Sequence, residues 1–138
     1  MDLIIDYTSP YVTRDEFLKV KGIDLTIELQ DNDNKSNKVE RFIADITNWV
    51  RKELVLKYLD NDLNSNVTEF SSLAEWRRKR FHAGMIEEIQ YLLDNGLLQQ
   101  DSGIIKETGM IMDYSQILIS NPALNEFRMG AFCNIQTA

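Results

Sequence analysis

The chain has one histidine and one cysteine, the side chains most often used as bases, nucleophiles or metal ligands. His82 and Cys133 are far apart in the sequence and neither has a flanking signature, so only the fold could assemble a Cys–His pair. We expect Cys133 to be a small apolar residue near the C-terminus and His82 to lie on a helix surface. A single cysteine also excludes an internal disulfide and a cysteine-rich zinc site.

An Asp/Asn-rich run, QDNDNKSNKVERF at residues 30–42, is the best candidate for a cation site. A calcium loop of the EF-hand type needs oxygen ligands at positions 1, 3 and 5, glycine at 6 and glutamate at 12. Counting from Asp31 places Lys35 at position 5 and Phe42 at position 12. The run instead fits a polar turn followed by a helix start, with Asn37 as N-cap and Glu40 three residues later. We therefore predict no metal site.

The remaining residues form no catalytic pattern. The glycine-containing stretches lack the Lys-Ser/Thr ending of a phosphate-binding loop. Glu87 and Glu88 are adjacent, but neighbouring residues on a helix point apart, so a solvated helix face explains them. We expect no catalytic residues, no cofactor and a protein that is not an enzyme.

The segment WRRKRFHAG, residues 76–84, concentrates the basic charge of the chain. Four consecutive bases fan round a helix and cannot form one stripe. Three interpretations stay open: a solvated surface, an acidic protein partner, or nucleic acid bound through residues 77–82. The net charge of −7 favours a protein partner over DNA.

A second candidate surface is an apolar stretch between residues 103 and 119. Its large apolar side chains are too numerous to leave in water on a loop. They are Ile104, Ile105, Met110, Ile111, Met112, Ile117, Leu118 and Ile119. Either they pack on the helices or they form a contact between subunits, where an exposed hairpin edge would suit an added strand.

The elements that position these groups are predicted to be mainly helices. Thr13 and Glu16 form a capping box before a short helix that Gly22 ends. Two long helices follow. The first runs to about Leu59, and the second begins around Ser71 or Ser72 and is ended by Asn95-Gly96 in the manner of a left-handed C-cap. Their buried faces are predicted to hold Val39, Phe42, Ile43, Ile46, Trp49, Val50 and Leu54, and then Trp76, Ala83, Ile86, Ile89 and Leu93. A last short helix starts near Pro122 and is closed by Gly130.

These signals predict a mainly α fold: a small bundle of two long and two short helices with a β-hairpin-like excursion near 103–119. The piece GIDLTIEL reads equally as extended or helical. With 138 residues, 43% hydrophobic and 27% charged, the chain suits one domain, 1–138, able to bury a core. The apolar part of MDLIIDYTSPYV is too short for a signal peptide or membrane span, which predicts a soluble protein made inside the cell.

The order of these elements resembles the head–tail connector (adaptor, neck) proteins of phages and prophages. The resemblance spans roughly residues 11–135. It is carried by EFLKVKGIDL, by the Asp/Asn turn, by NKVERFIADITNWV and by WRRKRFHAGMIEEIQYLLDNG. In the second long helix and the closing helix the matching residues are Phe81, Ile89, Gln90, Tyr91, Leu92, Asn95, Gly96, Ile119, Ser120, Ala123, Phe127, Arg128, Gly130 and Asn134.

The resemblance implies a non-enzymatic virion protein, made in the host cytoplasm, that forms a ring beneath the portal, commonly twelvefold. Its partners would be further copies of itself, the portal, and a further neck or tail-completion protein. DNA would pass through the acidic channel without sequence-specific binding, and no membrane is involved. The alternative is a small helical DNA-binding or regulatory module that uses residues 77–82.

The subunit and partner contacts are predicted at the basic block, the excursion and the tail AFCNIQTA, which is the candidate for reaching the portal. The residues are Arg77, Arg78, Arg80, Ile104, Ile105, Met110, Ile111, Met112, Ile117, Ile119, Phe132 and Ile135.

Overall fold

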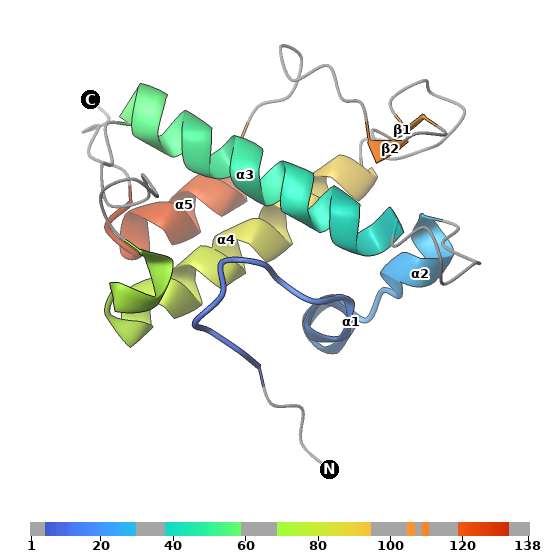
Figure 1. Cartoon of the computed structure of the whole chain (residues 1–138), viewed down its shortest axis with the longest axis horizontal. Helices are drawn as coiled ribbons and strands as arrows, with labels where there is room; N and C mark the ends of the chain where they lie inside the picture. Colours follow the sequence, from blue (N-terminus) through green and yellow to red (C-terminus); the bar gives the residue numbers. More distant parts are fainter. Residues whose placement is uncertain are drawn as a thin grey trace.

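The computed structural model describes residues 5–29, 38–58, 69–94, 105–106, 109–110 and 119–132 (Figure 1). The helices are α1 (Arg14–Lys21), α2 (Leu25–Glu28), α3 (Lys38–Tyr58), the 3₁₀ helix η2 (Phe70–Ser72), α4 (Glu75–Asp94) and α5 (Asn121–Met129). The prediction of a mainly helical bundle is confirmed. In Figure 1 α3 lies across the pair formed by α4 and α5, and the segment before α1 runs past α4.

The two short N-terminal helices have well-defined caps. Thr13 Oγ1 accepts a hydrogen bond from Glu16 N at 3.1 Å, which is one half of the predicted capping box. The other half does not form, because the carboxyl group of Glu16 lies against His82. Gly22 ends α1 in the left-handed region, with φ 73° and its N–H on Leu18 O at 2.8 Å. The ambiguous piece after it is helical, because the side chain of Asp24 caps α2 by accepting from Thr26 N at 2.9 Å.

The long helix α3 buries the face that its periodicity predicts. All seven predicted residues are core residues: Val39, Phe42, Ile43, Ile46, Trp49, Val50 and Leu54. The predicted cap residue Asn37 lies outside the described residues. The carboxylate oxygens of Glu40 accept from Arg14 Nη2 at 2.7 and 2.6 Å, which joins α1 to α3.

The α4 and α5 helices pack closely and run antiparallel. Ser120, at the start of α5, bonds to Glu88, whereas Gly130, after its end, lies against Arg80. The close approach depends on two glycines. A Cβ on Gly84 would lie 2.3 Å from a Phe127 ring atom, and one on Gly130 would lie 2.8 Å from the Phe132 ring.

The end of α5 differs in detail from the prediction. Gly130 has φ −87°, and the left-handed residue is Ala131, with φ 62°. Phe132 N donates to Phe127 O at 2.8 Å, the bond expected when a left-handed residue reverses the chain after a helix. Gly130 is therefore required for close packing rather than for its backbone conformation.

One core connects the helices. Phe81 lies at its centre, with ring centroids 5.2 Å from Phe70, 5.5 Å from Phe127 and 5.5 Å from Phe132. The predicted face of α4 is partly wrong: Ile86 and Ile89 are buried, but Trp76 is 56% exposed. The first turn of α4 extends beyond the core, so Trp76 is exposed to solvent although it continues the apolar periodicity of the helix.

The excursion is described only at β1 (Ile105–Lys106) and β2 (Gly109–Met110). These pairs of residues run antiparallel, with Ile105 opposite Met110 and Lys106 opposite Gly109, and β2 lies against α3. The predicted β-hairpin-like excursion over 103–119 is not supported beyond this short contact. Two residues a strand are too few for a stable hairpin on their own.

Candidate functional site

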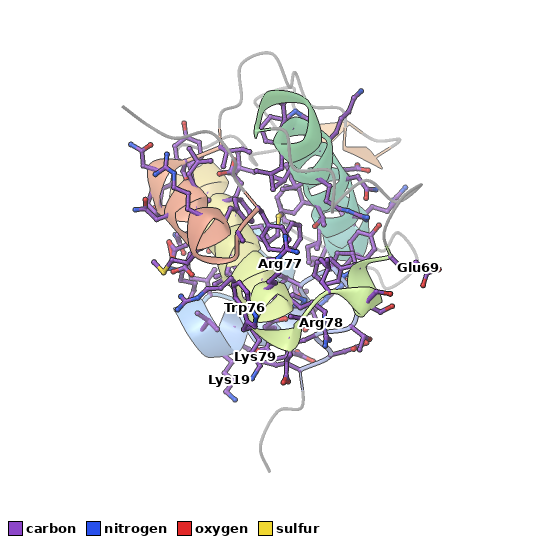
Figure 2. All side chains as sticks on the ribbon, turned by 90° about the vertical axis from the view of Figure 1, so that its left-hand side faces the viewer. Lys19, Glu69, Trp76, Arg77, Arg78 and Lys79 are labelled. Carbon is purple, nitrogen blue, oxygen red and sulfur yellow. The ribbon has the colours of Figure 1, made fainter. Side chains whose placement is uncertain are left out.

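The basic block at the start of α4 fans out in several directions (Figure 2). Arg77 reaches the chain after α5: Nε donates to Gly130 O at 2.8 Å and Nη2 to Ala131 O at 3.1 Å. Its guanidinium also lies 4.6 Å from the centroid of the Phe132 ring. Arg77 thus binds carbonyls that the end of α5 leaves without helical partners.

Arg78 binds residues that precede it in the sequence, whereas Arg77 binds residues that follow it. Its Nη1 donates to Tyr7 O at 3.1 Å, and its Nε donates to Leu73 O at 2.9 Å. The side chain therefore holds the segment before α1 against the start of α4. This role inside the chain was not predicted from the sequence.

Lys79 and Arg80 are the more exposed members of the block. The Lys79 ammonium lies 3.7 Å from Glu75 and 5.5 Å from the Tyr7 ring centroid. Arg80 Nη1 lies 3.0 Å from Glu126 Oε2, and its side chain is 46% exposed. Such exposed ion pairs contribute little to stability. The four bases of the block outnumber the two acidic neighbours, so this end of α4 keeps a net positive charge.

His82 is buried, which corrects the prediction of a helix-surface residue; it is 1% exposed. Nε2 lies 2.7 Å from Ser9 O, and because a carbonyl only accepts, Nε2 carries a proton. Nδ1 lies 3.0 and 2.9 Å from the two oxygens of Glu16, which is 2% exposed. The ring is therefore hydrogen-bonded at both nitrogens, to Ser9 O and to the carboxyl group of Glu16.

This arrangement makes His82 a structural residue. Both of its nitrogens are occupied, so neither is free to take a proton from a substrate or to bind a metal ion. The edge of the Tyr7 ring packs on the imidazole at a centroid distance of 4.9 Å. The Glu16–His82–Ser9 contacts join α1, α4 and the segment before α1 at one buried point.

Glu88 is a second buried acid on α4, with 0% exposure. Its Oε1 accepts from Ser120 N at 2.8 Å, and its Oε2 has no hydrogen-bond partner in the described part of the chain. Burial raises the pKa of Glu88 from 4.5 to about 7, although the Ser120 hydrogen bonds lower it. The site suits a protonated carboxyl group better than an ionised one.

We expect Glu88 to make stability depend on pH. The unfolded carboxyl loses its proton near 4.5 and the folded one near 7, so stability is greatest below 4.5 and falls as pH rises to about 7. The loss is roughly 3 kcal/mol at 1.36 kcal/mol per pKa unit. Urea unfolding from pH 4.5 to 8 should show this slope, and Glu88→Gln should remove most of it. Glu75→Gln, at an exposed position, should keep the wild-type slope; equal slopes for Glu88→Gln and wild type would contradict the assignment.

The predicted contact residues outside the basic block are scattered. Phe132 is a core residue with 0% exposure, and Ile119 is partly buried against the core. Ile105 and Met110 face each other in the β1–β2 pair. Ile104, Ile111, Met112, Ile117, Ile135 and the cysteine Cys133 lie outside the described residues.

Sequence reasoning missed a groove of about 560 Å³ between α3 and the segment leading into α1. Four of its lining residues are apolar or aromatic: Tyr11, Val12, Ile43 and Ala44. Its acidic side chains are Asp6, Asp15 and Glu40, and the last is paired with Arg14. Hydrogen bonds from Thr8 lower the pKa of Asp6, which keeps it ionised. The groove therefore combines an apolar floor with a net acidic rim.

The described residues contain no cluster of three or more His, Cys, Asp or Glu side chains placed to hold a metal ion. In the same part of the chain, no helix is both long and apolar enough to span a bilayer. Most of the Asp/Asn run, residues 30–37, lies outside the described residues.

No protein-family model, no curated protein and no solved structure matches this chain.

Proposed function

We propose that the chain is a structural protein of a phage or prophage neck. It forms a homo-oligomeric ring beneath the portal, joins the head to the next neck or tail protein, and is located in the virion. DNA passes through the ring without sequence-specific recognition. The function belongs to the assembled surfaces and requires no cofactor.

The proposal rests on the positions, within the fold, of the sequence patterns that resemble head–tail connector proteins. KVERFIADITNWV lies on α3, WRRKRFHAGMIEEIQYLLD lies on α4, and Ala123, Phe127 and Arg128 of the closing pattern lie on α5. Their apolar residues pack in one core: Phe42, Ile43, Ile46, Phe81, Ile89, Leu92, Ala123 and Phe127. Among the described elements, the order of short helix, two long helices and closing helix is the order in the connector-like pattern.

The alternative DNA-binding module has less support. Arg77 and Arg78 donate to carbonyls of their own chain, and His82 is buried. A DNA-binding surface needs cations that are available to phosphates. Within residues 77–82, Lys79 and Arg80 are the more exposed cations, and both have acidic neighbours.

The test is the size of the assembly, alone and with the portal protein of the same phage or prophage. We expect mass photometry and electron microscopy to show rings on the portal, and rings or smaller oligomers of the isolated protein at high concentration. A protein that stays monomeric and does not bind the portal under any condition would rule out the connector function.

A DNA-binding assay separates the two functions. Fluorescence anisotropy with duplex DNA should show no binding that is both salt-sensitive and lost in Arg77→Ala/Arg80→Ala. Strong binding with that behaviour in the monomer would favour the regulatory module instead.

A further inference from the structure

Two surfaces of opposite character are built by different elements of the molecule. The first is the groove between α3 and the segment leading into α1, which Asp6, Asp15 and Ile43 help to line. We call it the acidic groove.

The second surface consists of the first turns of α4 and the end of α5, and we call it the basic end. Residues 74–80 and 125–132 contain five basic and two acidic side chains, in a chain whose net charge is −7. Trp76 is 56% exposed and Met129 is 53% exposed. Figure 2 shows Trp76 at the start of α4 beside the basic side chains. Trp, Met and Arg are the residue types enriched at the centres of protein interfaces.

We propose that the basic end of one copy docks in the acidic groove of the next, with Trp76 in the groove. This inference rests on the proposed function, because it supplies the subunit contact that a ring needs. The apolar floor matches the exposed tryptophan, and the acidic rim matches the surrounding bases. Away from these two surfaces, two copies of an acidic chain repel each other. The pairing of the basic end with the acidic groove therefore fixes how one copy is placed on the next.

The geometry makes the contact head-to-tail. The two surfaces share no residue, so docking one copy on another leaves the groove of one copy and the basic end of the other unoccupied. Such a heterologous contact continues from copy to copy and closes into a ring when the rotation permits. A contact between two identical surfaces would instead stop at a dimer.

This arrangement can be tested with two variants that each retain one surface. Asp15→Arg/Ala44→Arg reverses the rim and fills the acidic groove. Trp76→Ala/Arg128→Glu removes the apolar anchor and a cation from the basic end. Each variant alone should lose at least tenfold in self-association, measured by sedimentation over a concentration series and repeated with the portal. Circular dichroism and urea unfolding check that both variants are folded.

The mixture of the two variants is the decisive sample. One variant keeps an intact basic end and the other an intact groove, so an equimolar mixture should form a one-to-one pair and grow no further. Ile27→Ala, at an apolar position that is 71% exposed but outside both surfaces, should assemble like the wild type.

The possible failures are distinguishable. If the wild type forms rings and the two variants assemble equally well, or if their mixture does not pair, the docking surfaces are wrong and the connector function stands. If the wild type never assembles, alone or with the portal, both proposals are overturned.

Discussion

Replacing His82 with alanine is expected to lower the free energy of unfolding by roughly 3–5 kcal/mol, because it removes a large buried side chain and one partner of a buried hydrogen-bonded pair. The change leaves the carboxyl group of Glu16, which is 2% exposed, without its partner, and Ser9 O without its donor. Urea unfolding monitored by circular dichroism measures the loss. Limited proteolysis should show earlier cleavage near Tyr7 and Ser9, because a contact that holds this segment is gone.

Two control variants separate the pair from general helix effects. Lys79→Ala, three residues before His82 and at an exposed position of α4, should cost less than about 1 kcal/mol. Glu16→Leu/His82→Phe, which replaces both buried partners with apolar groups, should recover much of the stability lost in His82→Ala. A loss below about 1 kcal/mol in His82→Ala would contradict the buried pair.

Adding one methyl group at Gly84 is the second large expected effect. The new Cβ would lie 2.3, 2.7 and 2.7 Å from three atoms of the Phe127 ring, inside the α4–α5 contact. Alanine is favoured over glycine in a helix by about 1 kcal/mol. We nevertheless expect Gly84→Ala to lower the free energy of unfolding by about 1–3 kcal/mol, since a packed core resists an inserted group. Urea unfolding again provides the measurement.

A double-mutant cycle shows whether the Phe127 ring is the cause. Phe127→Leu alone should destabilise by leaving space in the core. Gly84→Ala/Phe127→Leu should be less destabilised than the sum of the single changes, with a coupling of about 0.5 kcal/mol or more. Additive effects, or a stabilising Gly84→Ala, would show that α5 approaches α4 less closely than described.

Local patterns predicted the parts of the fold that depend on local physics. The period of α3 identified its seven buried residues because a helix with one buried face repeats its apolar residues every three or four positions. Thr13 and Gly22 were recognised as caps because such residues satisfy backbone groups of their own helix. The same reasoning failed at Trp76, because periodicity does not reveal where a helix leaves the core.

The contacts between distant segments could not be predicted in the same way. Glu16 and His82 are 66 residues apart, and each alone resembles an ordinary polar residue on a helix. The run Arg77 to Arg80 looked like a surface for a partner, yet two of its members bind carbonyls within the chain. The acidic groove is assembled from two segments, neither of which indicates a groove by itself.

The start of α4 has a consequence for how the chain reaches its final form. Arg78 and His82 bond to residues 71 and 73 positions earlier, whereas Arg77 bonds to residues 53 and 54 positions later. Both kinds of contact close long loops, which carry the largest entropic cost of closure and form slowly. During synthesis the segment before α1 must wait for α4 to emerge, and α4 must then wait for α5. We infer that the segment before α1 and the chain after α5 are fixed last. Both are held by the first two turns of α4.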